Sequence, residues 1–255
     1  MRFLDIDLDA FLSSVAFYRN GGERLDPEAY QPWTEARLRD FLERQCGLSR
    51  DHPIPGWFVE DHDGAFDVMR ALVGDACRPL EVIHVDAHAD LGMGDASWVD
   101  LIEHVGLPLA ERREPKRGDH LLSLGSWLAY ALAADFISAL TYVHPARRGK
   151  DLTAIHFRNG DVESGSIEMK AYTRPDLPAD GASPDYWRLV KLAPDLALAP
   201  VPFATATLDD FAATAPFDVG LLCHSPSYTP ATADALIPIV GEYIDFQGGP
   251  FRSGQ

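Results

Sequence analysis

The first nine residues of the chain read MRFLDIDLD, and from position 4 onward leucine or isoleucine alternates with aspartate. Successive side chains of a strand point to opposite faces, so this alternation predicts a strand with one apolar face and one acidic face. Same-face neighbours lie roughly 7 Å apart, so Asp5, Asp7 and, if the strand runs on, Asp9 would repel one another. Either this face is solvated at the edge of a sheet, or something positive lies in front of it.

A second segment has the same spacing. Residues 83–90 read IHVDAHAD after an apolar approach, so Asp86, His88 and Asp90 stand at every second position. Carboxylate oxygens and imidazole nitrogens are ligands of divalent cations. If the two segments lie side by side, four carboxylates and an imidazole meet at one point, which predicts a metal site and favours two ions.

The 255 residues suit one α/β domain spanning positions 1–255. Strands and helices are expected to alternate, which favours a mostly parallel sheet with helices on both faces. An Asn-Gly pair at 159–160, between β-like runs, predicts a hairpin. The expected strands are 56–62, 79–85, 140–143, 195–203 and 217–223, and the expected helices are one capped by Thr34 and ended by Gly47, then 65–73, 96–105, 121–134 and 231–243.

The formal net charge of −17 argues against nucleic acid or an anionic membrane as a partner, and favours a cationic substrate. Cys46, Cys77 and Cys223 lie far apart and form no zinc-binding pattern, so free thiols in a reducing compartment are expected. The N-terminus has no signal-peptide pattern, and no apolar run approaches the ~18 residues that span a bilayer. We therefore expect a cytoplasmic protein, and the sequence leaves its oligomeric state open.

Four more polar residues near the ends of predicted strands or at a helix start are candidates for the site. His62 follows a predicted strand and is a candidate metal ligand, or else a cap for the next helix. Glu60 could contact the substrate or orient a ligand, or it could be an exposed loop residue. Asp119 is a candidate for substrate binding or a helix N-cap, and Cys223 is a candidate for the pocket lining or a small buried residue.

Histidines outside these segments are candidates for proton transfer, because their ordinary pKa lies near neutrality. His120, at the start of a predicted helix, is the preferred candidate. His144 and His156 are its rivals, and each of the two could equally be a satisfied, partly buried histidine.

These motifs resemble those of the arginase/ureohydrolase superfamily. Residues 86–90 are similar to its DAHxD metal motif, residues 4–7 to its SxDxD motif, and residues 59–62 to its GGDH motif. Residues 118–120 loosely resemble its GNxH loop, and 222–226 resemble its ExNP segment. The order is permuted, because the SxDxD-like strand opens this chain. A permuted order is typical of a branch with an N-terminal LDIDLD strand that includes peptide arginases.

The resemblance implies a permuted three-layer α/β sandwich of the arginase/deacetylase type with two Mn²⁺ ions. Carried over by position, the first ion would be bound by His62, Asp86, Asp90 and Asp5, and the second by Asp86, His88, Asp5 and Asp7. Asp90 and His120 would then be the catalytic residues. The guanidinium-binding glutamate of the family falls on Cys223, so that carboxylate must come from elsewhere, or the substrate is recognised differently.

The activity that the resemblance implies is hydrolysis of a guanidinium group. We prefer peptidyl arginine in a cationic peptide as the substrate, with peptidyl ornithine and urea as the products of a peptide-maturation step. Another amidohydrolase of this fold, agmatinase-like or deacetylase-like, is an alternative. A metal-stabilised binding protein without catalytic activity is a third possibility.

Overall fold

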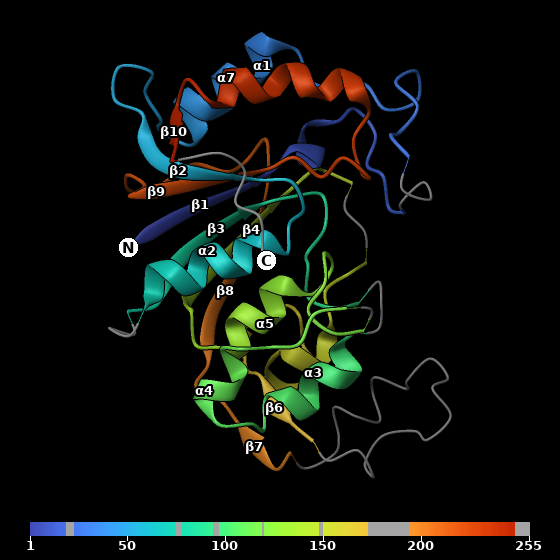
Figure 1. Ribbon diagram of the computed structural model, residues 1–255, viewed down its shortest axis with the longest axis vertical. Coiled ribbons are helices and arrows are strands. Elements are labelled where there is room, and N and C mark those ends of the chain that lie inside the picture. The colour runs from blue at the N-terminus through green and yellow to red at the C-terminus, as the bar shows by residue number, and fades with distance from the viewer. Residues whose placement is uncertain are drawn as a thin grey trace.

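The computed structural model describes residues 1–18, 23–74, 78–93, 97–118, 120–147, 150–172 and 194–247. Its centre is an eight-stranded sheet in the order β10-β2-β9-β1-β3-β4-β8-β5 (Figure 1). Every neighbouring pair in it is parallel except β5 and β8, and β6 and β7 form a separate antiparallel pair. The strands are β1 Arg2–Asp7, β2 Ile54–Val59, β3 Leu80–Val85, β4 Ile137–His144, β5 Ser166–Ile167, β6 Lys170–Ala171, β7 Leu196–Ala197, β8 Val201–Thr207, β9 Val219–Cys223 and β10 Ile244–Phe246.

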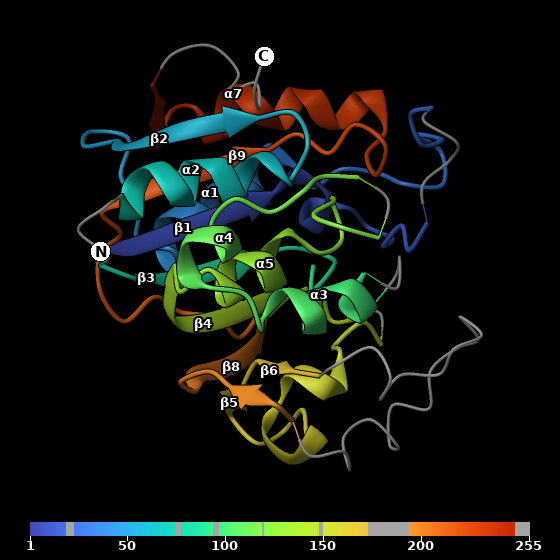
Figure 2. The same cartoon turned by 60° about the horizontal axis from the view of Figure 1, so that its bottom comes forward.

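Helices cover both faces of this sheet, as Figure 2 shows. Helices α2 and α5 pack on one face, and α1 and α7 lie on the other, each over its own apolar cluster. The expected α/β fold with a mostly parallel sheet is confirmed, and the arrangement is consistent with a three-layer sandwich. None of the helices that the structure describes has both the length and the hydropathy to cross a bilayer. They are α1 Glu35–Asp40, α2 Gly64–Val73, α3 Trp98–His104, α4 Leu109–Arg112, α5 Trp127–Ala133 and α7 Ile237–Val240.

The N-terminal strand β1 lies in the middle of the sheet, between β9 and β3. Asp5 is opposite His84 in β3, so the two alternating segments are side by side and parallel, as predicted. Leu4 and Ile6 pack in the cluster under α1 and α7, while Phe3 packs in the cluster under α2 and α5. The predicted alternation of faces is therefore confirmed, and the acidic face of β1 points toward α2 and α5.

The strand ends earlier than the alternation does. Leu8–Phe11 form a turn of 3-10 helix, and the side chain of Asp7 caps it by accepting a hydrogen bond from the backbone N–H of Asp9 at 2.9 Å. Aspartate is a favoured residue at such a cap because its short side chain reaches the free backbone donors. Asp9 therefore belongs to the turn and not to the strand.

Three expected elements differ from the structure. The predicted hairpin is wrong: Asn159 has a φ of 58° within a 3-10 turn, Arg158–Gly160, and a single bridge, Phe157 to Ile167, joins the described arms. On its other side Ile167 pairs with Val201 of β8. The strand expected at 195–203 is divided between β7 and β8. The helix expected at 231–243 is a 3-10 turn followed by α7, and the chain then pairs with β2 as β10, whose three residues are too few to show a period.

Candidate metal centre

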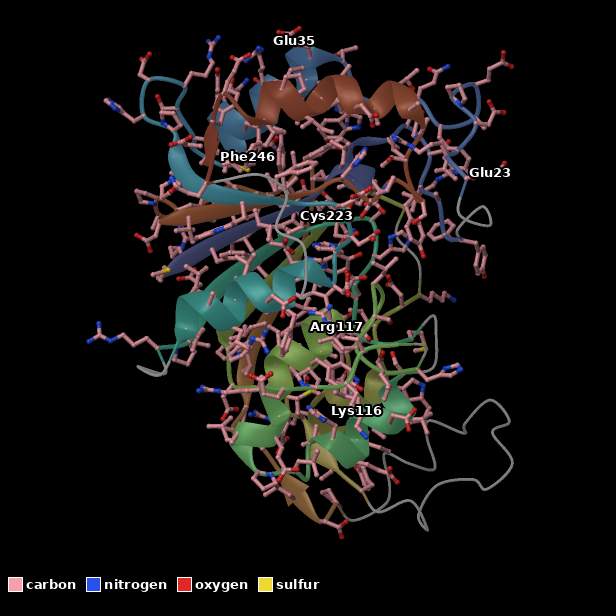
Figure 3. All side chains as sticks on the ribbon, in the orientation of Figure 1. Glu23, Glu35, Lys116, Arg117, Cys223 and Phe246 are labelled. Carbon is pink, nitrogen blue, oxygen red and sulfur yellow. The ribbon has the colours of Figure 1, made fainter. Side chains whose placement is uncertain are left out.

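The acidic and histidine side chains meet at the carboxyl ends of the central strands. Asp7 ends β1, Asp86 directly follows β3, and His62 comes three residues after the end of β2. Because parallel strands end at the same edge of a sheet, this edge is where open α/β sheets place ligands. Cys223, labelled in Figure 3, is the last residue of β9 and lies opposite Asp7. All of these side chains are buried.

Three carboxylates converge on one nitrogen of His62. Its Nδ1 lies 3.0 Å from Asp7 Oδ2, 3.0 Å from Asp86 Oδ2 and 3.2 Å from Asp90 Oδ2. A single N–H can make a good hydrogen bond to only one of these oxygens. Its other nitrogen, Nε2, lies 3.1 and 3.2 Å from the two oxygens of Asp5. When Nε2–H donates a hydrogen bond to a carboxylate, the lone pair of Nδ1 is available for a metal ion, and metal-binding histidines are usually held in this way.

A second group forms around His88. Its Nδ1 lies 3.0 Å from Asp9 Oδ2 and 3.6 Å from Asp86 Oδ1. Its Nε2 donates a hydrogen bond to the backbone oxygen of Ala16 at 2.9 Å, so here too Nδ1 is the nitrogen that faces the carboxylates and could bind an ion. Asp86 contributes one oxygen to each group, because its Oδ2 faces His62 and its Oδ1 faces His88.

Backbone N–H groups hold the carboxylates of the second group in place. Asp86 Oδ1 accepts a hydrogen bond from the backbone of His88 at 2.7 Å. Asp9 Oδ1 accepts one from the backbone of Ala87 at 3.3 Å. In each case the segment 86–88 supplies the donor, so the local chain geometry fixes where both carboxylates point.

Side chains hold the carboxylates of the first group. The indole Nε1 of Trp127, in α5, donates to Asp90 Oδ2 at 2.6 Å. The hydroxyl of Ser225, in the turn after β9, donates to Asp7 Oδ2. Asp90 and Ser225 have positive φ angles of 50° and 46°, which non-glycine residues adopt infrequently. Two different loops are thus bent to bring these contacts to the cluster.

Two oxygens of the cluster have no hydrogen-bond partner among the described residues, namely Asp9 Oδ2 and Asp86 Oδ2. Each is buried, and each lies 3.0 Å from an imidazole Nδ1. A buried carboxylate oxygen without a partner is strongly unfavourable unless a cation fills its place. The ligand atoms are hard oxygens and imidazole nitrogens, so the residues present fit a divalent cation. Four trios have ligand atoms within 4.8 Å of one another: Asp5, His62 and His84; Asp7, His62 and Cys223; Asp9, Asp86 and His88; and His62, Asp86 and Asp90.

The pKa values reflect this crowding. Burial and the charge of Asp86 raise the pKa of Asp90 to about 6. Burial and the charge of Asp7 raise the pKa of Asp9 well above its ordinary value. Burial lowers the pKa of His88, but the charge of Asp9 outweighs it and the net shift is well upward. The metal-free cluster therefore retains protons that a bound cation would displace.

Behind the cluster lies a pair that needs no cation. His84 Nδ1 is 2.7 Å from Asp5 Oδ2, and His84 Nε2 is 3.1 Å from the backbone oxygen of His88. Burial disfavours charge on His84, but the hydrogen bond to Asp5 outweighs it and raises the pKa of His84 to about 9. Burial likewise raises the pKa of Asp5, but the charge of His62 outweighs it and the net shift is downward. Asp5 and His84 thus form a buried ion pair.

A cavity of about 920 Å³ opens onto the cluster. Asp7 and Asp9 line it, whereas Asp5 lies behind His62 and is absent from its wall. His120 lines the cavity from an exposed position with φ of 62°, so the preferred candidate for proton transfer lies on the same space as the cluster. The wall also includes Phe17, Tyr18, Asp61, Leu91, Met93, Lys150, Asp151 and Tyr228.

Other residues predicted for the site lie away from this wall. Glu60 is exposed, and its backbone oxygen accepts a hydrogen bond from Ser225 at 3.0 Å. Cys223 is buried with its Sγ 3.2 Å from Ser225 Oγ, and burial raises the pKa of its thiol. His156 is buried, and burial lowers its pKa to about 4. Neither these three nor His144 belongs to the wall of the cavity in the described chain.

One residue predicted for the site cannot be placed, and two residues of the site have no ligand role in the sequence prediction. Asp119 is outside the described residues. Asp9 was recognised as part of the acidic run but was given no ligand role, although its position in that run was a usable signal. Asp151 had no signal of its own, because it reaches the site only through the fold.

Comparisons with protein-family models, with curated proteins and with solved structures found no match. The fold and the site therefore define the class by themselves. This is an α/β protein with a mostly parallel sheet, and a buried aspartate and histidine cluster at its carboxyl edge could hold a metal ion.

Proposed function

We propose that the cluster binds two divalent cations, with Mn²⁺ preferred, and that the protein is a hydrolase acting on a guanidinium group. The observation that carries this proposal is the pair of buried, unpartnered oxygens on Asp9 and Asp86 beside two imidazole Nδ1 atoms. Carboxylate and imidazole ligands without thiolate suit Mn²⁺. The buried Cys223 is no exception, because its raised pKa keeps the thiol protonated.

In the proposed ligand set Asp9 enters and Asp5 leaves. His62, Asp7, Asp86 and Asp90 would hold the first ion, and His88, Asp9 and Asp86 the second. Asp7 thereby takes the place of Asp5 at the first ion, and Asp9 takes the place of Asp5 and Asp7 at the second. Asp5 instead keeps His62 in the tautomer that leaves Nδ1 free.

When bound, the two cations would supply a water of lowered pKa and positive charge beside the carbon under attack. The side chains of the protein have their own tasks. Trp127 and Ser225 orient two of the ligands through their hydrogen bonds. His120, on the wall of the cavity, would pass a proton to the nitrogen that leaves. The reaction adds one water: its oxygen bonds to the guanidinium carbon, the bond from that carbon to the side-chain nitrogen breaks, and urea and an amine result.

The preferred substrate is peptidyl arginine, which becomes peptidyl ornithine. Its cationic side chain suits a cavity lined by carboxylates in a chain of net charge −17, which would also attract a basic peptide over distance. The exposed aromatic side chains of Phe17 and Tyr18 on the wall suit a substrate larger than a free amino acid. The motifs shared with the arginase/ureohydrolase superfamily support the same choice.

The test is urea release from an arginine-containing peptide with Mn²⁺, and mass spectrometry should find a loss of roughly 42 Da per arginine, as expected for hydrolysis to ornithine. Asp86→Ala should abolish both signals, because Asp86 contributes to both groups. Asp245→Ala, an exposed carboxylate on the edge strand β10, is the matched control and should behave like the wild type. Equal urea release by the wild type and by Asp86→Ala would refute the proposal.

The alternatives give other results in the same experiments. One metal ion per chain by elemental analysis, with hydrolysis of an acetylated amine, would indicate a deacetylase-like enzyme. Release of urea from agmatine but from no peptide would indicate an agmatinase-like enzyme. A rise in melting temperature on adding metal, with no guanidino or amide compound hydrolysed, would indicate a binding protein.

A further inference from the structure

Asp151, in the segment after β4, is a carboxylate of the cavity that the cluster does not use. Its Oδ2 accepts a hydrogen bond of 2.7 Å from the backbone N–H of Ala89. Ala89 lies between His88 and Asp90, so this bond fixes Asp151 directly against the metal-binding segment. Its Oδ1 is buried and has no hydrogen-bond partner within the described part of the chain. The residue also lines the cavity.

Counting charges shows why this carboxylate stands apart. Asp7, Asp9, Asp86 and Asp90 carry four negative charges, which two divalent cations would balance. Asp151 is then left with a negative charge that the cluster does not offset. Asp151 is half-buried and one of its two oxygens has no hydrogen-bond partner in the described chain, so a cationic group with N–H donors in the cavity would stabilise it.

We infer that Asp151 is the carboxylate that receives the cationic guanidinium of the substrate. This inference rests on the proposed function. It names the residue that would make the enzyme select a cationic substrate. It also answers what takes the place of the missing glutamate, because Cys223 lies outside the wall of the cavity. The bond to Ala89 holds the carboxylate rigidly beside the ligands, so a guanidinium bound to it is held close to the cluster.

Two side chains of the protein itself are rivals for Asp151 Oδ1. Tyr142, in β4, is buried, and its hydroxyl likewise has no hydrogen-bond partner among the described residues. Burial and the charge of Asp151 raise its pKa well above the ordinary value, so the two groups are close enough to interact. Lys150 lines the same cavity with an exposed side chain, so the charge of a bound guanidinium would compete there with the lysine ammonium.

The test compares capped arginine, N-acetyl-arginine amide, with the neutral and nearly isosteric capped citrulline on Mn²⁺-loaded protein. Dissociation constants come from calorimetry, and KM is used where urea is released. The wild type should bind capped arginine at least about tenfold more tightly than capped citrulline. Asp151→Asn should weaken capped arginine by about 10- to 100-fold and abolish the preference, with Mn²⁺ content and melting temperature unchanged. Asp151→Glu should recover part of the preference, because it keeps the charge.

Two control variants accompany this comparison. Asp161→Asn changes an exposed aspartate whose Oδ1 also accepts a backbone hydrogen bond, from Glu163 at 3.0 Å, and it should keep the full preference. Tyr142→Phe should keep it too, whereas its loss there would show that the hydroxyl, and not a ligand, is the partner of Asp151.

The outcomes separate this inference from the proposed function. If Asp151→Asn keeps the preference, or loses Mn²⁺ together with it, the inference is wrong even where the wild type releases urea. If the wild type releases no urea but prefers capped arginine in a manner that depends on Asp151, the hydrolase proposal fails and the role of Asp151 stands.

Discussion

The two ends of the N-terminal acidic segment, at Asp5 and at Asp9, contain the same residue type but differ in how far the protein satisfies the carboxylate. At the inner end, Asp5 is hydrogen-bonded by His84 and lies against His62 Nε2, so its charge is met within the protein. At the outer end, Asp9 is equally buried, yet one of its oxygens has no hydrogen-bond partner in the described chain. Burial of an aspartate therefore does not by itself indicate a metal site, whereas a buried oxygen that the protein leaves unsatisfied requires a partner from outside the chain, such as an ion.

The difference follows from where each residue lies on the sheet. Asp5 is inside β1, where the register places His84 of the neighbouring strand directly opposite. Asp9 lies beyond the end of β1, in the 3-10 turn Leu8–Phe11, where no residue of a neighbouring strand is paired with it. There the neighbours are His88, whose Nδ1 lies 3.0 Å from Asp9 Oδ2, other carboxylates and the cavity. The sheet supplies partners along its length and leaves its carboxyl edge for a ligand.

The largest expected effect comes from removing the cations that the outer end requires. Chelation followed by dialysis should lower urea release by at least about 10³-fold, because the charge stabilisation and the activated water are worth several kcal/mol. Returning Mn²⁺ should restore the rate, which urea release measures. Full activity in chelated protein shown to be metal-free by elemental analysis would contradict the proposed chemistry.

A second prediction sets the two ends against each other directly. Asp5→Asn should destabilise the metal-free protein by about 3–5 kcal/mol, because it leaves the charge of His84 buried without its partner. Asp9→Asn should cost the metal-free protein less, since the lost contact with His88 is offset by relief of the repulsion from Asp7 and Asp86, but it should weaken Mn²⁺ binding. Urea denaturation with chelator and titration with Mn²⁺ measure the two effects. The same stability loss in both variants would remove the distinction.

The third prediction concerns pH. The raised pKa of Asp90, about 6 against 3.8 unfolded, makes the metal-free protein lose stability as pH rises from about 4 to 6. The raised pKa of His84, about 9, contributes stability below 6.5 that is lost as pH rises toward 9. Each shift is worth on the order of 3 kcal/mol. The lowered pKa of Asp5 matters only below 3.8 and does not oppose this trend.

With Mn²⁺ the trend should reverse, because the ligands must lose protons to bind the ion. Melting temperatures at pH 5, 6.5 and 8, with chelator and with Mn²⁺, are therefore expected to diverge as pH rises. If the melting temperature changed with pH in the same way with chelator and with Mn²⁺, the protons lost from the cluster would not be coupled to metal binding.

Much of the inner end could be predicted from the sequence, because a period of two specifies which residues share a face. That period correctly gave the shared face of Leu4 and Ile6, which are buried in one cluster, and the metal prediction required the two segments to lie side by side, as β1 and β3 do. The same period treated Asp9 as a third strand position, since it cannot show that the cap at Asp7 ends the strand. The outer end therefore depends on local turn geometry that alternation does not encode.

Contacts between segments that are far apart in the sequence could not be predicted from local periodicity. Asp151 meets Ala89 across 62 positions of sequence, and only the packing of the loops after β3 and β4 brings them together. The hairpin at Asn159 was wrong for a similar reason, because Ile167 pairs with β8, a strand more than 30 residues further along. Local signals gave the conformation of the turn and not the partner of the strand.

The smallest predicted effect concerns Trp127, whose Nε1 donates to Asp90 while its ring lies 4.8 Å from that of His62. Trp127→Phe removes this donor, so Mn²⁺ affinity should fall about tenfold, as is usual when a group that orients a ligand is lost. Trp98→Phe is the matched control, because Trp98 is equally buried but packs in a separate cluster with Ile102, Ile155 and Tyr172. Both variants should lose some stability through the smaller ring, and only Trp127→Phe should weaken Mn²⁺ binding in a calorimetric titration. Equal affinities would mean that the hydrogen bond from Trp127 does not orient Asp90 for the ion, and that the cluster depends less on α5 than this contact indicates.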